Sequence, residues 1–127
     1  MTPVVELSSR RCLSVASNLI DQIIEFVDQY YTQPISLHDV ADAVGYSPCH
    51  LTTTFRRAKG LPVTAWIIKR RVEEAERLLA SSNVSVATAC ETVGFRDVCY
   101  FSRQFVRHVG MTPGRYRAAR REVREYA

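Results

Sequence analysis

Cysteine and histidine are the residue types in this chain that could bind a metal ion or supply a nucleophile and its base. The four cysteines, at positions 12, 49, 90 and 99, are separated by 37, 41 and 9 residues, so the chain has no Cys-x-x-Cys pair. The three histidines are scattered as well. These spacings predict four free thiols, no disulfide framework, no structural zinc and no metal site. With no phosphate-binding glycine loop and no paired carboxylates at a recognisable spacing, we expect no catalytic site, no cofactor and no enzymatic activity.

Charged side chains are distributed unevenly along the 127 residues. Residues 1–46 contain two basic and six acidic residues, a net charge of −4, whereas residues 47–127 contain 15 basic and seven acidic residues, a net charge of +8. Such a separation is typical of a surface that binds a polyanion. Charge alone fits a solvated basic face equally well.

Hydropathy argues against a membrane location. The longest apolar runs are only a few residues, such as 65–68, and a bilayer-spanning helix needs roughly 20. Residues 1–16 contain no long apolar stretch followed by a small-residue cleavage site, so we expect no secretory signal. These features predict one globular chain without a membrane partner, located in the cytoplasm.

Apolar residues recur at steps of three and four throughout the chain, and capping residues divide the pattern into about seven helices with no strand. In the helix that follows Ser47, we expect Leu51, Phe55 and Ala58 to face the core. The longest helix is expected over residues 63–80, with Trp66 as its core anchor. The expected helix starts are Ser17 or Asn18, Ser36, Ser47, Val63, Ser85, Asp97 and Thr112, and six of the ends lie at Gln33-Pro34, Gly45, Gly60, Ala80, Gly94 and Gly110.

Part of this pattern occurs twice. Residues 36–46 reappear at 85–95 with an offset of 49, and residues 49–60 reappear at 99–110 with an offset of 50. Each copy consists of a short helix, a turn with a glycine and a second capped helix, which is the sequence form of a helix-turn-helix. We therefore expect an all-α fold with two helix-turn-helix subdomains joined by a long helix. The expected divisions are a tail at 1–18, a first subdomain at 19–62, the linking helix at 63–80 and a second subdomain with a basic C-terminal helix at 81–127.

The repeat and the basic second part together indicate a protein that reads double-stranded DNA. A recognition helix presents to the bases the face opposite its buried residues. The short side chains of Thr52 and Thr53 favour loose or water-mediated contacts, whereas Arg103 can donate two hydrogen bonds to a guanine or, with equal weight, bind a phosphate. We expect base-facing positions at Cys49, His50, Thr52, Thr53, Val98, Cys99, Ser102 and Arg103, and phosphate contacts from Arg56, Arg57, Lys59, Arg107 and Arg115.

Residues 36–48, 93–105 and 110–117 resemble the DNA-binding domain of the AraC/XylS transcription regulators. The resemblance runs from about Leu19 to Arg120 and leaves no room for a sensor domain, as in the stand-alone members of the family. It implies an activator that binds asymmetric promoter sites as a monomer and contacts RNA polymerase. It also implies a location in the cytoplasm of a bacterial cell, in association with the nucleoid. It also places base or backbone contacts at Cys49, Thr52, Thr53 and Arg56.

Two alternatives remain at this point. A DNA-binding domain excised from a longer sensor-regulator would have the same sequence features. A helical interaction protein that does not bind DNA would show uncharged or acidic faces on the two reading helices. If the linking helix is rigid, we expect the reading helices on one side of the DNA, in successive major grooves roughly 34 Å apart, on a site of about 20 base pairs.

Overall fold

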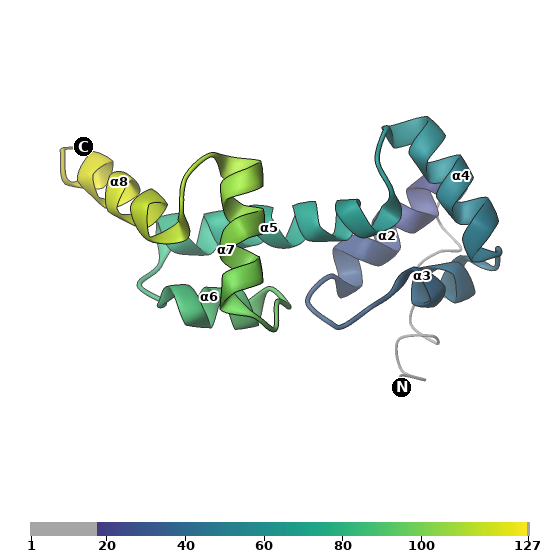
Figure 1. The fold of residues 1–127 in the computed structure, drawn as a ribbon, viewed down its shortest axis with the longest axis horizontal. Coiled ribbons are helices and arrows are strands. Elements are labelled where there is room, and N and C mark those ends of the chain that lie inside the picture. The colour runs from purple at the N-terminus through teal and green to yellow at the C-terminus, as the bar shows by residue number, and fades with distance from the viewer. Residues whose placement is uncertain (1–17, 127) are drawn as a thin grey trace. The chain divides into compact units, whose positions relative to one another are not determined.

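The computed structural model describes residues 18–126, with side chains described through Arg121. Seven helices and no strand are present in this part of the chain (Figure 1), which confirms the predicted all-α fold with its two helix-turn-helix units. The helices are α2 (Leu19–Tyr30), α3 (Leu37–Val44), α4 (Pro48–Lys59), α5 (Val63–Ser81), α6 (Val86–Thr92), α7 (Val98–Val109) and α8 (Pro113–Tyr126).

Capping side chains fix where most of these helices begin. At α3, the Ser36 N–H donates to Asp39 Oδ2 at 2.8 Å and the Asp39 N–H donates to Ser36 Oγ at 3.3 Å, a reciprocal capping box. At α4, Ser47 Oγ accepts from the His50 N–H at 3.2 Å, and Pro48 stands at the first helical position, where its missing N–H has no consequence. The chain leaves α4 through Gly60, whose φ of 81° is the left-handed conformation that glycine adopts without strain.

The chain divides into two compact units, Met1–Ile67 and Ile68–Ala127. In the first unit, α2, α3 and α4 pack on one another around a core that includes Phe26 and Phe55, and the start of α5 adds Ile67. The Trp66 ring lies edge-on to Phe55 with 5.6 Å between the ring centroids. Trp66 therefore anchors α5 in this core, as its position in the helical period predicts.

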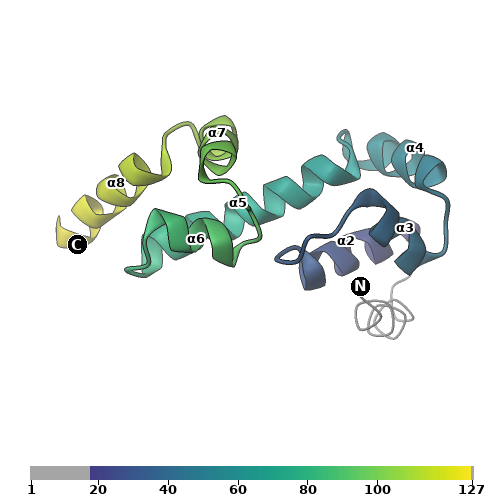
Figure 2. The same cartoon turned by 60° about the horizontal axis from the view of Figure 1, so that its bottom comes forward.

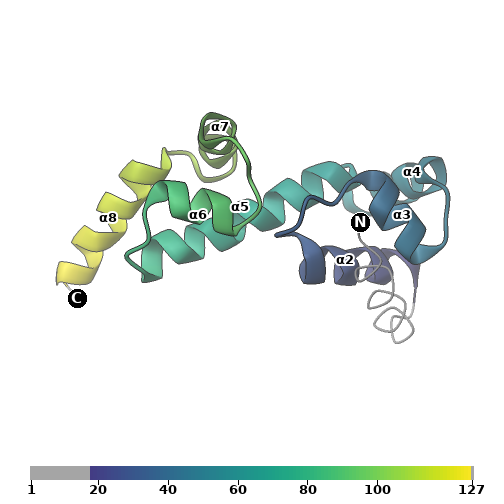
Figure 3. The ribbon, with the colours of Figure 1, turned by 90° about the horizontal axis from the view of Figure 1, so that it is seen from below.

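In the second unit, α7 packs against α6. Figure 2 shows α8 following α7 after a short turn. Figure 3 shows α7 end-on beside α6. Two aromatic rings of α7, Phe101 and Phe105, are fully buried in a core built from α5, α6 and α7. The Tyr116 ring of α8 packs edge-on against Phe105 at a centroid distance of 5.6 Å, and Arg117 Nη2 donates to the Val84 carbonyl before α6. The C-terminal helix is thus held to its own unit by both apolar and polar contacts.

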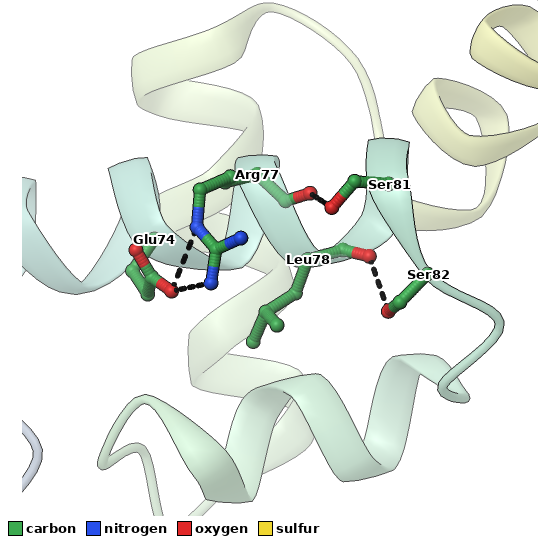
Figure 4. Close-up of polar contacts among 5 residues, drawn as sticks. All are labelled: Glu74, Arg77, Leu78, Ser81 and Ser82. Atoms are coloured by element: carbon green, nitrogen blue, oxygen red, sulfur yellow. Dashed lines mark hydrogen bonds and ion pairs between the residues drawn. The ribbon is translucent and has the colours of Figure 1, made fainter.

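Charged side chains along α5 pair with one another. Lys69 Nζ lies 2.7 Å from Glu73 Oε2, and Arg77 Nε donates to Glu74 Oε2 at 3.0 Å. Near the C-terminal end of the helix, the Ser81 and Ser82 hydroxyls donate to the carbonyls of the residues four positions earlier at 2.6 and 2.7 Å (Figure 4). The basic residues of this helix are therefore largely balanced by carboxylates of the same helix. In the described part of the chain, no helix combines the length and apolar character that crossing a bilayer requires.

Three local predictions are wrong. The first helix, predicted to end at Gln33-Pro34, ends at Tyr30 with Tyr31 as the C-cap residue. Ala58 is exposed, because residues 56–60 all lie in solvent and the last turn of α4 extends beyond the core. The helix predicted to continue to Gly94 ends instead at Thr92, with Val93 as the C-cap residue.

Candidate nucleic-acid interface

The second helix of each helix-turn-helix, α4 in the first unit and α7 in the second, has one buried face and one exposed face. We call α4 and α7 the reading helices. Leu51 and Phe55 anchor α4, and Phe101 and Phe105 anchor α7, all with an exposed fraction of 0%. Since these anchors are four residues apart, the residues between and beside them face solvent on the opposite side. Each unit thus packs one face of this helix into its core and leaves the opposite face exposed to a ligand.

On α4, Cys49, His50 and Thr53 are exposed, as predicted for base-facing residues, whereas Thr52 is half-buried. The Thr52 hydroxyl donates to the Pro48 carbonyl at 2.9 Å, so its proton is already used within the helix. Thr52 can therefore contact a base through its methyl group, or accept a hydrogen bond through the lone pairs of its hydroxyl oxygen. The His50 ring stacks on Tyr46, with 5.0 Å between centroids and 17° between planes.

On α7, Val98, Cys99 and Arg103 are exposed and Ser102 is half-buried. Val98 presents its methyl groups with 42% of the side chain exposed, a surface suited to a thymine methyl group. Arg103 lies over the ring of Tyr100, with 5.9 Å between Cζ and the ring centroid. The four predicted residues of this unit therefore lie on the N-terminal half of a single helix.

Sequence reasoning missed three exposed apolar residues near these faces. Tyr46, Tyr100 and Val106 have exposed fractions of 48%, 37% and 41%. Tyr100 and Val106 could have been found by extending the outward face by one turn in each direction from Arg103. Tyr46 could not, because its counterpart in the repeat, Phe95, is buried.

The basic residues predicted to contact phosphates are all exposed. Within the described residues, Arg57, Arg107 and Arg115 make no ion pair with a carboxylate, in contrast to the paired residues of α5. Lys59 Nζ lies over the Trp66 ring, 5.5 Å from its centroid. At the start of α8, the Arg115 N–H is taken by Thr112 Oγ1 at 3.3 Å, so this backbone amide is not free for a phosphate. The positive charge of the reading helices remains available for an external anion. The five predicted residues are Arg56, Arg57, Lys59, Arg107 and Arg115.

Three cysteines are free thiols: Cys49 and Cys99 are exposed, and Cys90 is buried. Burial raises the pKa of the Cys90 thiol, and the nearby carboxylates of Asp97 and Glu91 raise it further. The remaining predicted free thiol, Cys12, lies outside the described residues. Among the residues that the structure describes, no group of three or more His, Cys, Asp or Glu side chains could hold a metal ion.

Comparison with known proteins assigns this architecture to a family. A model described as a helix-turn-helix domain matches residues 40–119. The HTH-type transcriptional activator AarP of Providencia stuartii is 30% identical over 86% of this chain and 81% of its own length. The bifunctional transcriptional activator/DNA repair enzyme AdaA of Bacillus subtilis is 32% identical over 80% of this chain, which spans 48% of AdaA.

Solved structures agree with these relatives. The DNA-binding domain of the global transcriptional factor AdpA, solved in complex with a target DNA, has a TM-score of 0.81 and 27% identity, and the match covers 87% of this chain and 100% of that one. The C-terminal domain of AraT, a response regulator from Geobacillus stearothermophilus, has a TM-score of 0.77 and 26% identity over 81% of this chain and 86% of that one. With its repeated helix-turn-helix and its two reading helices, this chain belongs to the AraC/XylS family of DNA-binding transcription regulators.

Proposed function

We propose that this chain activates transcription by inserting α4 and α7 into successive major grooves of a promoter, roughly 34 Å apart on a site of about 20 base pairs. The observation that carries the proposal is the unbalanced positive charge on the exposed helices. Arg57 and Arg107 stand at equivalent positions of the repeat and have no carboxylate partner among the described residues. A helical interaction protein without DNA would need neutral or acidic reading faces.

The base contacts belong to the N-terminal halves of the two helices in this proposal. Cys49, His50, Thr52 and Thr53 face one half-site, and Val98, Cys99, Ser102 and Arg103 face the other. Phosphates are bound by Arg56, Arg57, Lys59, Arg107 and Arg115, and these contacts fix the register of both helices on the duplex.

The partners follow from the family. We assign to the chain a monomeric state on asymmetric sites and a contact with RNA polymerase, and the names of AarP and AdaA support the role of activator. The proposed role requires no catalytic step and no cofactor.

The salt dependence of binding to a selected duplex tests the electrostatic part of the proposal. Each phosphate that a basic side chain neutralises contributes about −0.9 to the slope of log affinity against log salt concentration. We expect Arg57→Ala and Arg107→Ala to weaken binding to specific and random duplexes alike and to make the slope shallower by about one each. Fluorescence anisotropy at several salt concentrations measures the slope.

Arg77→Ala is the matched control, because it also removes one positive charge but affects an arginine that is bonded to Glu74 on α5. Its slope should stay close to that of the unmodified chain. Binding to duplex DNA without salt dependence, or an equal change of slope in all three variants, would contradict the proposal.

A further inference from the structure

Tyr100 stands in an unusual setting for an exposed aromatic residue. It lies on α7 one turn before Arg103, and 37% of its side chain is exposed. The Arg103 guanidinium lies over the ring, with 5.9 Å between Cζ and the centroid, within the range of a cation–π contact. The exposed ring therefore has a charged neighbour on the surface that faces the DNA in the proposed function.

The Tyr100 ring also contacts the core of the second unit. The Phe95 ring, 4% exposed, lies 6.0 Å from it between centroids. Phe95 is itself held in place, because its N–H donates to the Cys90 carbonyl at 3.0 Å and its ring lies 5.1 Å from that of Phe101. Tyr100 thus connects a fixed part of the core to a long, exposed side chain.

Arg71 of α5 strengthens this arrangement. Its Cζ lies 5.9 Å from the Phe95 ring centroid. Burial lowers the pKa of Arg71, and the electrostatic interaction with Tyr100 partly opposes that change. The half-buried Arg71 therefore contacts Phe95, and the exposed Arg103 contacts Tyr100.

The contact with the Tyr100 ring can reduce the entropy that Arg103 loses when it binds a base. An arginine that forms two hydrogen bonds with a guanine must adopt one of many side-chain conformations, and a free arginine side chain loses rotamer entropy when it does so. A ring that restricts the guanidinium before binding reduces the ordering cost on the DNA. The first unit has no such device, since the equivalents of Tyr100 and Arg103 are His50 and Thr53, and the His50 ring stacks on Tyr46.

We propose that Tyr100 is a positioning residue that presents Arg103 to a base edge and thereby sets the sequence preference of the second unit. The inference rests on the proposed function, which gives Arg103 a base contact. It adds a residue that acts through Arg103 without itself reading a base.

The pairing can be tested first on the full chain without DNA. The ring current of Tyr100 shifts the resonances of the Arg103 δ protons and of its Nε–H group, which NMR detects. Tyr100→Phe keeps the ring and should keep the shifts, whereas Tyr100→Leu should move them to the values of an unrestrained arginine. Shifts that are unchanged in Tyr100→Leu would show that the two side chains do not associate, which overturns the proposal.

The second test measures base preference with single-base variants of one bound duplex. An exposed cation–π contact corresponds to about a two- to fivefold effect on an equilibrium. We expect Tyr100→Leu to lower the preference at the base position that is sensitive to Arg103→Ala by about that factor, and Tyr100→Phe to leave it unchanged. In the Arg103→Ala background, Tyr100→Leu should cause no further loss of preference. Tyr46→Leu, an exposed tyrosine of the other unit, is the matched control and should leave this position unaffected.

The remaining outcomes distinguish a failure of the positioning role of Tyr100 from a failure of the base contact of Arg103. If Tyr100→Leu weakens binding to all duplexes equally, with or without Arg103, then Tyr100 contacts the DNA itself or supports the fold, and the positioning role is wrong. If Arg103→Ala leaves every base preference unchanged, the base contact of Arg103 is wrong and the role of Tyr100 in specificity fails with it. The salt slopes of Arg57→Ala and Arg107→Ala still decide whether the chain binds DNA through its reading helices.

Discussion

Thr53 and Arg103 occupy the same place in the two repeats, and both are exposed. A bidentate arginine gives about 1–3 kcal/mol of discrimination between bases, and a threonine methyl group against a thymine gives less. We expect Arg103→Ala to relax the base preference in its own half-site by that amount, and Thr53→Ala to cost less and to act mainly at thymine positions. Competition binding with single-base variants of one good site measures both effects.

Two results would contradict this division between the units. Thr53→Ala could prove more damaging than Arg103→Ala, or Arg103→Ala could weaken specific and random DNA equally. The second result would make Arg103 a phosphate contact.

The exposed face of each reading helix could be predicted from the sequence, whereas side-chain conformations could not. The spacing of Leu51 and Phe55 determines which residues of α4 face outward, and Thr53 is exposed accordingly. The hydroxyl of Thr52 bonds the helix backbone at Pro48, which depends on a rotamer that residue spacing does not specify. Tyr100 could have been added to the outward face by the same spacing, but its contact with the Arg103 side chain could not, because that contact also depends on a rotamer.

At the scale of helices, the starts were predictable because short local signals determine them. Asn18, Ser36, Ser47, Ser85 and Asp97 each accept a backbone N–H at the start of a helix. The contact of Arg117 with the Val84 carbonyl joins residues that are 33 positions apart, and no local pattern indicates such a pair.

Two glycines at the α7–α8 turn allow a matched test of helix termination. Gly110 has a φ of 97°, in the left-handed region, whereas Gly114 lies in the first turn of α8 outside that region, and a Cβ atom would meet no other atom within 4 Å at either position. We expect Gly110→Ala to lower the free energy of unfolding by about 1–2 kcal/mol, since a left-handed alanine is strained. Gly114→Ala should leave stability unchanged or raise it by up to about 1 kcal/mol.

Urea unfolding followed by circular dichroism measures both variants in the same unit. Because the open space around the two sites is equal, steric clashes cannot account for a difference between them. A Gly110→Ala variant as stable as Gly114→Ala would show that the turn relaxes to another backbone conformation.

The chain as a whole carries an acidic excess before position 47 and a basic excess after it, which was visible in the sequence. The division into compact units falls between Ile67 and Ile68, inside the continuous helix α5. Helical periodicity predicts the helix, but not the residue at which its side chains change from one core to the other, because that depends on which long-range partners each residue meets.

Stability should depend on pH in the alkaline range. Burial raises the pKa of Cys90 above its ordinary value of 9.0 and the pKa of Tyr116 above 10.0, with carboxylates adding to both shifts. Between the ordinary and the raised pKa, the unfolded chain has released a proton that the folded chain still holds. We therefore expect the contribution of these two groups to the free energy of unfolding of the second unit to be fully present below pH 9. It should fall as the pH rises above 9 for Cys90 and above 10 for Tyr116.

Urea unfolding at half-unit steps from pH 7.5 to 10.5 checks this dependence. Cys90→Ala should remove the part of the decrease that begins near pH 9 and leave the part that Tyr116 contributes. Stability that stays constant or rises over this interval would refute the assignment.

The internal repeat allows the outward residues of one copy to change independently of those of the other copy. Phe55 and Phe105 correspond in the two copies and are both fully buried, while the outward pair Thr53 and Arg103 has diverged. A duplicated segment that retains its packing residues can exchange its outward residues without refolding, so each copy can acquire a new preference while the other keeps the chain on its site. If α4 and α7 read the two half-sites as proposed, transplanting the outward residues of α7 onto α4 should give a chain that prefers the same bases in both half-sites.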